Sequence, residues 1–187
     1  MAELHELTVG AGRIVLVRAD ITTLSVDAVV NAANSHLAGG GGVDGAIHRA
    51  AGHRELQEEL HRRYPSGCAT GSAVVTGGHR MAARHIVHAV GPRWSASAAE
   101  RCDEQLRSAY RSAFALAAEQ GCATVAAPSL STGIYGFPIE RAAPIALAEA
   151  RAALEAEGTP LREIRFALFS EADLAVFAGA LAAVNRG

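Results

Sequence analysis

Short apolar segments rich in β-branched residues alternate along the chain with longer amphipathic segments. The short segments predict strands, at 7–9, 13–18, 27–31, 73–76, 85–90, 124–127 and 164–169. The longer segments predict helices, at 44–51, 54–64, 98–120 and 139–157, and residues 170–173 open a final helix. Strands that alternate with helices predict an α/β domain built in layers.

Two polar loops each follow a short apolar strand directly. The first starts at the end of strand 27–31 and contains four consecutive glycines, and the second covers 129–136, after strand 124–127. Ligands of open α/β sheets bind beyond the carboxyl ends of the strands. We therefore expect the two loops to face one cleft.

The glycine run at 39–42 precedes a predicted helix, an arrangement that exposes backbone N–H groups to a phosphate. Asp44 opens that helix, and its carboxylate would repel a phosphate. We therefore interpret Asp44 as a chemical group beside a bound anion. Taken alone, the segment also fits a flexible loop in which Asp44 only caps the helix.

Residues 40–45 also satisfy G-x-G-x-x-G, the fingerprint of dinucleotide-binding folds. That fingerprint turns directly from a strand into a helix, whereas residues 32–39 intervene here. Asp44 would in addition meet the pyrophosphate with a like charge. The sequence therefore argues against a nicotinamide-dependent oxidoreductase.

Asp44 and His48 are four residues apart and therefore share one face of the predicted helix. His48 is either a core residue satisfied by a hydrogen bond or a group that orients Asp44 or a water molecule. The pair lacks a third metal ligand at a suitable spacing, so no metal site is predicted.

The second loop offers successive N–H groups and the hydroxyls of Ser131 and Thr132, which suit the far side of a diphosphate. A structural turn is the alternative for this loop. Tyr135 lies between glycines, where the backbone can expose its ring. Asp20 follows a strand, and its carboxylate can accept from the exocyclic amine of adenine while the N–H of Ile21 meets the ring.

Length, composition and net charge limit the number of domains and the kinds of partner. The 187 residues fit one domain, 1–187, and half of them are hydrophobic. The net charge of −2 gives no basic field that would steer the chain to nucleic acid.

The cysteines and the chain ends bear on location. Three widely spaced cysteines without a CxxC pair favour a reducing compartment and no structural zinc. The first residues lack a signal-peptide pattern, and the longest apolar run, 174–184, is too short to cross a bilayer. We expect a cytoplasmic monomer that does not contact a membrane.

Residues 31–52 resemble a segment of the macrodomain family, specifically of its MacroD-type ADP-ribosyl hydrolases. Residues 129–138 resemble the second phosphate-binding loop of the family, and 18–22 and 86–92 show weaker similarity. The resemblance implies a three-layer α/β/α macrodomain with a mixed central sheet. Residues 79–83 depart from the family pattern, which has a tyrosine, a leucine and a proline there, and this departure concerns local packing.

The resemblance also implies an ADP-ribose site with defined parts. Adenine would lie by Asp20, Ile21 and Phe169, although Phe169 fits the core equally well. The diphosphate would lie between two loops, which consist of Gly40, Gly41, Gly42 and Val43 and of Ser131, Thr132, Gly133, Ile134, Tyr135 and Gly136. The distal ribose would lie by Asn34 and Tyr135, and the remaining implied residues are Asn31 for binding and Asn34, Asp44 and His48 for catalysis.

The implied activity is hydrolysis at the distal ribose without a metal or a cofactor. It would remove mono-ADP-ribose from acidic side chains of proteins and deacetylate O-acetyl-ADP-ribose. The chain lacks the Cys and His insertion of zinc-dependent macrodomains. Its partners would be ADP-ribose and mono-ADP-ribosylated proteins, with ADP-ribosylated nucleic-acid ends as a further class. A non-catalytic ADP-ribose reader and an ADP-ribose 1″-phosphate phosphatase are the alternatives.

Overall fold

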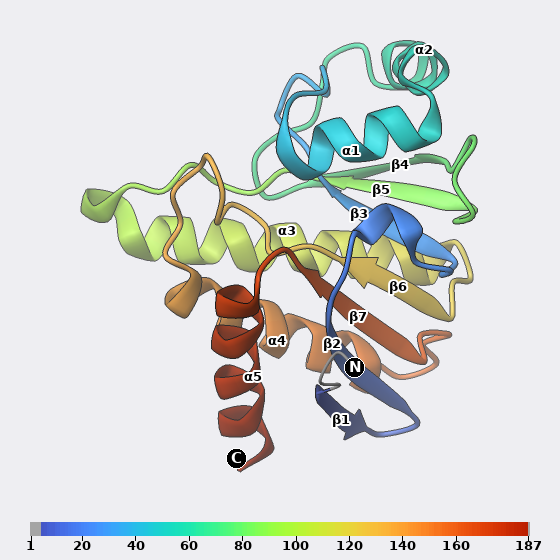
Figure 1. Ribbon diagram of the computed structural model, residues 1–187. Helices are drawn as coiled ribbons and strands as arrows, with labels where there is room; N and C mark the ends of the chain where they lie inside the picture. The colour runs from blue at the N-terminus through green and yellow to red at the C-terminus, as the bar shows by residue number, and fades with distance from the viewer. Residues whose placement is uncertain (1–4, 187) are drawn as a thin grey trace.

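Seven strands form one mixed sheet in the computed structural model, which describes residues 5–186 (Figure 1). The strands are β1 (His5–Val9), β2 (Gly12–Arg18), β3 (Ala28–Ala32), β4 (Ala73–Gly77), β5 (His85–Ala89), β6 (Thr124–Ala127) and β7 (Glu163–Leu168). All the strands predicted from the sequence are present. Residues 1–4, on which part of the signal-peptide prediction rests, lie outside the described residues.

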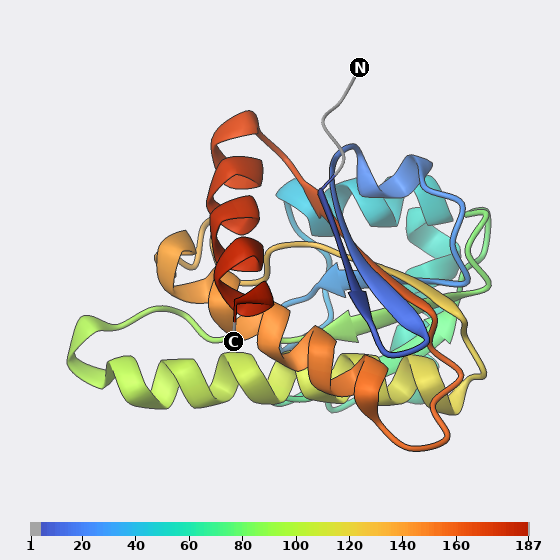
Figure 2. The same ribbon diagram turned by 90° about the horizontal axis from the view of Figure 1, so that it is seen from below.

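Helices cover both faces of the sheet (Figures 1 and 2). One face carries α1 (Gly42–Ala51) and α2 (His53–Arg63), and the other carries α3 (Ala99–Glu119), α4 (Ile139–Glu155) and α5 (Glu171–Asn185). Two short 3-10 helices, η1 (Ile21–Thr23) and η2 (Ala96–Ala98), lie in loops. The predicted three-layer α/β/α arrangement with a mixed sheet is therefore confirmed.

The sheet is parallel at its centre and antiparallel at both edges. Its order is β1-β2-β7-β6-β3-β5-β4, and only the pairs β1–β2 and β4–β5 among the described strands are antiparallel. The parallel strands therefore end at the same edge of the sheet. Because β3 and β6 are hydrogen-bonded neighbours, with Val29 opposite Ala126, the two loops selected from the sequence lie side by side.

Helix α1 begins earlier than the sequence pattern indicates. Its first residue is Gly42 rather than Asp44, and Gly41 is the N-cap, without a side-chain hydrogen bond to the helix. The glycine run thus supplies the cap and the first helical residue. Asp44 lies in the first turn, where a negative charge interacts favourably with the helix dipole.

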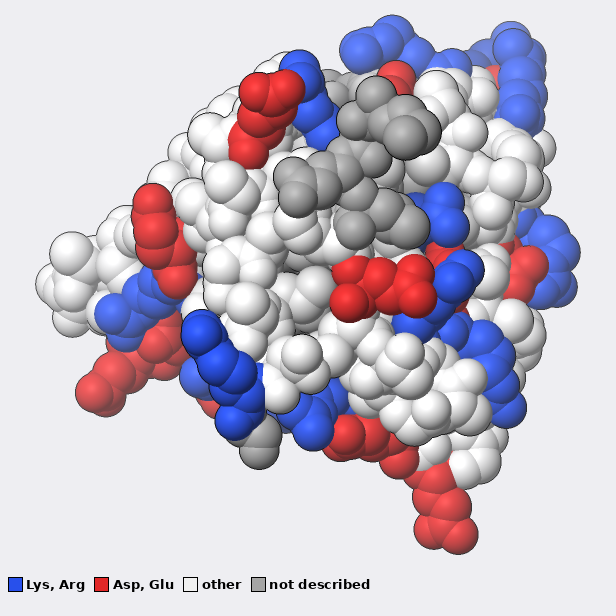
Figure 3. All heavy atoms as spheres, turned by 60° about the horizontal axis from the view of Figure 1, so that its bottom comes forward, with Lys and Arg blue, Asp and Glu red and all other residues white. Residues whose placement is uncertain are grey.

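Acidic and basic residues are interspersed on the face shown in Figure 3. Several form ion pairs, such as Arg141 with Asp103 and Arg13 with Glu163, each at 2.7 Å. Among residues 5–186, no helix has the length and apolar character needed to span a membrane.

Tyr110 of α3 links the larger core to the second loop. Its ring is fully buried and packs against Phe114 and Phe166. Its hydroxyl donates to Pro128 O at 2.9 Å and accepts from the N–H of Leu130 at 2.8 Å. Burial raises the pKa of this phenol, so the hydroxyl keeps its proton. These bonds fix the chain where β6 passes into the second loop.

Replacing Tyr110 with Phe should lower the free energy of unfolding by about 1–3 kcal/mol, because two buried backbone groups would lose their partner. Denaturant unfolding measures this loss. Tyr64→Phe is the control, since the Tyr64 hydroxyl bonds to Val75 O at a site that is only partly buried. Equal losses in the two variants would contradict a special role for Tyr110.

Candidate functional site

Two adjoining pockets lie at the carboxyl edge of the sheet. The smaller pocket has a volume of about 230 Å³ and is lined by residues that include Asp44 and Tyr135. The larger pocket has a volume of about 690 Å³ and is lined by residues that include Asp20 and Phe169. The two pockets form one cleft, because they share four lining residues: Gly42, Val43, Ser129 and Gly133.

Most residues selected from the sequence line this cleft. The exceptions are Asn31, His48 and Gly136. Asn31 and His48 are buried behind the cleft wall. Gly136 closes a turn of the second loop, in which its N–H donates to Gly133 O at 3.0 Å.

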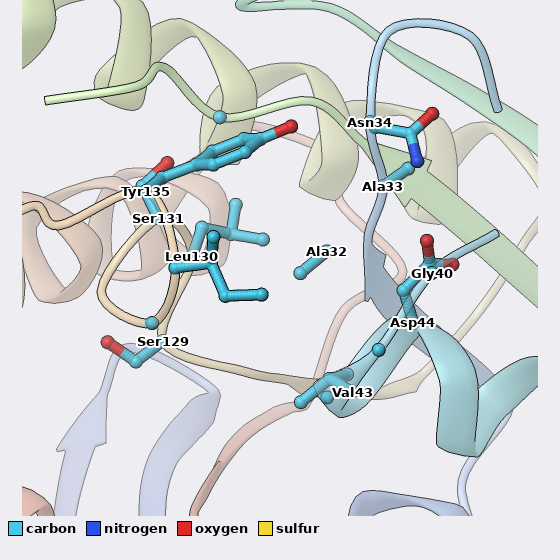
Figure 4. Close-up of a pocket in the computed structure, with 15 residues that line it drawn as sticks. Ala32, Ala33, Asn34, Gly40, Val43, Asp44, Ser129, Leu130, Ser131 and Tyr135 are labelled. Atoms are coloured by element: carbon cyan, nitrogen blue, oxygen red, sulfur yellow. The ribbon is translucent and has the colours of Figure 1, made fainter. Parts of the chain in front are cut away.

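Residues whose backbone N–H groups are free line both pockets. The first helical hydrogen bond of α1 runs from the N–H of Gly45 to Gly41 O at 3.1 Å. Within residues 5–186, the N–H groups of residues 42–44 have no hydrogen-bond acceptor, nor do those of residues 131–135 across the cleft (Figure 4). Such donors, together with the positive end of the α1 dipole, suit an anion.

Ser131 holds the second loop in a strained conformation. Its φ of 66° lies in the left-handed region, which side chains other than glycine rarely adopt. Its Oγ lies so close to Gly91 that a Cβ there would overlap it. Among the described residues, this buried hydroxyl has no hydrogen-bond partner. Strain of this kind persists only where the surroundings impose it, and here Ser131 O accepts from the N–H of Phe137 at 2.9 Å.

Donors from two elements hold the Asp44 carboxylate, which is 7% exposed. Asn31 Nδ2, on β3, donates to Asp44 Oδ1 at 2.8 Å. His48 Nδ1, one turn along α1, lies 3.0 Å from Oδ1 and 2.9 Å from Asp44 O. No side chain of the described residues donates to Oδ2, and Asp44 lines the smaller pocket (Figure 4). One carboxylate oxygen is thus fixed while the other stays open.

His48 fits both sequence interpretations, because it is a hydrogen-bonded core residue whose bonds orient Asp44. Burial is the largest influence on its pKa and lowers it. The hydrogen bonds to the Asp44 side chain and carbonyl, together with the Asp44 charge, outweigh burial and raise the pKa above its ordinary value. On the other side of the ring, His48 Nε2 lies 2.8 Å from Gln57 Nε2 of α2.

A row of buried polar side chains continues from Asn31 into the sheet. His88 of β5 lies opposite Asn31 in the strand register, and its Nδ1 is 3.1 Å from Asn31 Nδ2. His88 Nε2 lies 3.0 Å from Thr76 Oγ1 of β4. Burial lowers the pKa of His88 to about 3, so this imidazole is neutral.

Asp20 and Phe169 lie in the larger pocket. Asp20 Oδ1 accepts from the hydroxyl of Thr22 at 2.7 Å and from its N–H at 2.9 Å, and these two bonds lower the Asp20 pKa. Phe169 is 90% exposed, so the alternative that it belongs to the core is wrong. Its stacking on adenine stays a prediction. Arg49 of α1 also lines the larger pocket and adds a positive charge there.

Asn34 and Tyr135 lie on opposite sides of the smaller pocket, and the Tyr135 ring extends across it (Figure 4). The Asn34 amide braces its own loop: Nδ2 donates to Gly39 O at 3.0 Å, and Oδ1 accepts from the N–H of Ala38 at 3.2 Å. The guanidinium of Arg93 lies 4.9 Å from the centre of the Tyr135 ring.

Sequence reasoning did not identify Gln57, His88 and Thr76. His88 and Thr76 could have been noticed, because each is a polar residue inside an apolar strand. Gln57 gave no such signal, because it is one of many polar residues on its helix. Among residues 5–186, no group of three or more His, Cys, Asp or Glu side chains could hold a metal ion.

Comparisons with known proteins give a consistent result. Residues 30–146 match the Macro domain family. A macro domain-containing protein of Chlorobaculum tepidum is 49% identical over 89% of this chain and 94% of its own length. O-acetyl-ADP-ribose deacetylase 1 of Pantoea vagans is 52% identical over 72% of this chain and 79% of its own. The crystal structure of a Trypanosoma brucei macrodomain in complex with ADP-ribose superposes with a TM-score of 0.80, at 40% identity, over 90% of this chain and 68% of that one.

The neutral His88 should make the protein less stable in acid. Unfolded chains bind a proton at histidine below a pH of about 6.5, whereas folded His88 does so only below about 3. Neutral His88 therefore contributes its full share to the free energy of unfolding above about pH 6.5. This contribution is lost as the pH falls toward 3, by up to about 1.4 kcal/mol per pH unit. Denaturant unfolding across this range measures the loss. NMR assigns it to His88, whose ring should not titrate above about pH 4.5; a ring titrating near 6.5 would contradict this.

Proposed function

The chain belongs to the macrodomain family, and we propose that it binds ADP-ribose in the cleft and hydrolyses bonds at the distal ribose. Its substrates are mono-ADP-ribose esters on acidic side chains of proteins and O-acetyl-ADP-ribose. The name of the Pantoea vagans relative supports the second substrate. The observation that carries the proposal is a carboxylate with one open oxygen beside a cleft lined by free N–H donors.

The free N–H groups support a diphosphate at the junction of the two pockets. They belong to residues at the start of α1 and in the second loop, which face each other across the cleft (Figure 4). A diphosphate held there directs the bulkier adenosine into the pocket of about 690 Å³ and the distal ribose into the one of about 230 Å³. The exposed ring of Phe169 is then available to adenine, and Asp44 meets the distal ribose.

Asp44 is the general base in this proposal. Its open Oδ2 takes a proton from a water molecule, whose oxygen attacks the anomeric carbon or the carbonyl carbon of the attached ester. In the first case the C1″–O bond breaks, a carboxylate leaves, and Asp44 then gives its proton to solvent. In the second case the ribose oxygen leaves and takes the proton back from Asp44. The two N–H loops orient the ribose for either attack, because they fix the diphosphate next to it.

A non-catalytic reader is the second candidate, and it would use the same cleft. A reader needs the N–H donors, but it gains nothing from a carboxylate beside the bound anion. Asp44 is nevertheless buried and held in one orientation by Asn31 and His48. This arrangement favours hydrolysis over binding alone.

Replacing Gly41 with Glu should abolish ADP-ribose binding and leave the fold intact. Gly41 has a φ of −92°, which any residue adopts, and a Cβ there meets no neighbour among the described residues. Gly42 is less suitable, since its φ of 56° would strain a side chain. A carboxylate near the diphosphate should weaken binding roughly 100-fold or more by repulsion. Calorimetry measures the affinity, with Gly179→Glu on α5 as the control. Unchanged affinity in Gly41→Glu would exclude the glycine run as the phosphate site.

Asp44→Asn should separate binding from hydrolysis. Asparagine keeps the size of the side chain and an oxygen that accepts from Asn31 and His48. Alanine would instead leave one buried N–H of Asn31 without a partner and His48 Nδ1 with only the main-chain oxygen of residue 44. Release of ADP-ribose from a glutamate-modified protein should fall by roughly 100-fold or more, in line with the loss of a general base. The affinity for ADP-ribose should stay within several-fold.

The control for Asp44→Asn is Glu58→Gln, which removes one exposed carboxylate from α2. A wild-type rate in Asp44→Asn would make the proposed mechanism wrong. If the wild type binds ADP-ribose tightly and hydrolyses none of the esters, the reader replaces the hydrolase. ADP-ribose 1″-phosphate and ADP-ribosylated nucleic-acid ends, assayed in parallel, test the remaining predicted substrates.

A further inference from the structure

Gln57 lies outside the cleft lining, yet it bonds to both the first loop and the histidine behind Asp44. Its Nε2 is 2.9 Å from Leu37 O, in the loop that carries Asn34 and the glycine run. The same nitrogen is 2.8 Å from His48 Nε2. The partly buried side chain therefore connects α2 to the loop and to α1.

The bond to Leu37 O determines the direction of the hydrogen bonds that follow. A carbonyl oxygen only accepts, so the Gln57 atom facing it is the amide nitrogen; the flipped amide would set two oxygens against each other. The second N–H of this nitrogen then donates to His48 Nε2, which must accept. In neutral His48 the proton is consequently on Nδ1, where it donates to Asp44.

A second chain of hydrogen bonds reaches Asp44 from the sheet, and the direction of each bond can be deduced in the same way. Thr76 Oγ1 donates to Gly77 O at 3.1 Å, so it accepts from His88 Nε2 at 3.0 Å. His88 Nδ1 is then an acceptor and takes one N–H of Asn31 at 3.1 Å. The other N–H of Asn31 goes to Asp44 Oδ1. Both chains of hydrogen bonds end on Asp44 Oδ1 and leave Oδ2 free.

We propose that Gln57 is a positioning residue for hydrolysis, which fixes the proton of His48 on Nδ1 and thereby the orientation of the Asp44 carboxylate. The inference rests on the proposed function. Gln57 acts on the loop as well, because the N–H that it donates to Leu37 O holds the main chain between Asn34 and the glycine run. Leu37 itself is buried and has a φ of 56°, so this segment is strained and benefits from the bond.

Gln57 also disfavours a second proton on His48. An imidazolium would point Nε2–H at the Gln57 amide nitrogen, which is itself a donor. The other titratable groups near His48 are Asp44 on its own helix, His53 of α2, whose ring centre is 5.3 Å away, and His88 of β5. Asp44 favours the imidazolium and Gln57 opposes it. A carboxylate in place of the Gln57 amide would favour the imidazolium form of His48, because the carboxylate accepts from Nε2–H.

Two substitutions at Gln57 test the proposal. Gln57→Glu keeps the size and turns the donor to His48 into an acceptor, and Gln57→Met removes the polar group. Arg62→Gln, at an exposed position of the same helix, changes the net charge by as much as Gln57→Glu and is the control. The ring ¹⁵N shifts of His48 report its protonation, and kcat, KM and the ADP-ribose Kd report on the cleft.

In the wild type, at a pH where NMR shows His48 to carry a single proton, that proton should be on Nδ1. Gln57→Glu should carry a proton on both nitrogens at that pH, and Gln57→Met should show a mixture of tautomers. In both, kcat should fall roughly tenfold. The Kd for ADP-ribose should rise only a few-fold, because both variants lose the bond to Leu37 O while the N–H groups of α1 and of the second loop remain. Arg62→Gln should match the wild type in every readout.

Three results would overturn the proposal. A wild-type His48 with its proton on Nε2 contradicts the deduced bond directions. Wild-type kcat in both Gln57 variants, with altered His48 shifts, shows that hydrolysis does not depend on this proton and leaves the proposed function standing. A wild type that binds ADP-ribose and hydrolyses no ester removes both the function and the role of Gln57, even if the shifts agree with the bond directions.

Discussion

A buried negative charge is the constraint on which the rest of this site depends. Asp44 is 7% exposed and lies in the first turn of α1, beside N–H groups that have no acceptor among the described residues. A charge that is largely removed from water must be satisfied by hydrogen-bond donors of the protein. If Asp44 used the N–H groups of its own helix, these groups would not be available to the proposed diphosphate. The donors come instead from Asn31 below the helix and from His48 one turn along it, so the N-terminus of α1 stays available.

The need for these donors explains a row of polar residues in an otherwise apolar sheet. Asn31, His88 and Thr76 are almost completely buried on three neighbouring strands, β3, β5 and β4. Asn31 uses both N–H groups as donors, and its Oδ1 is left buried without a partner among the described residues. An unpaired acceptor of this kind costs about 1–3 kcal/mol. The Asn31 amide keeps this orientation because the flipped amide would place its oxygen against the Asp44 carboxylate.

The sequence predicted the strands, the helices and the two loops, because each depends on local patterns of apolar residues and glycines. The i, i+4 spacing also predicted that Asp44 and His48 meet. That β3 and β6 are neighbours could not be read from local patterns, since strand order is a property of the whole sheet. Gln57 was missed for a related reason. Its partners are a backbone carbonyl and a ring nitrogen on other elements, and a polar residue on a helix is expected to face solvent.

The cleft separates two kinds of interaction that affect a reaction differently. In the proposed function, the N–H groups at the start of α1 and in the second loop bind the diphosphate, away from the bond that breaks, and assist hydrolysis only by orienting the ribose. The Asp44 carboxylate has the opposite character. In the proposed mechanism its charge opposes the bound anion, and its open oxygen contributes only when a water molecule gives up a proton. A site selected for binding alone would gain from losing Asp44, and with it the reason for the buried bonds of Asn31 and His48. The presence of these bonds therefore supports the proposed hydrolysis over binding alone.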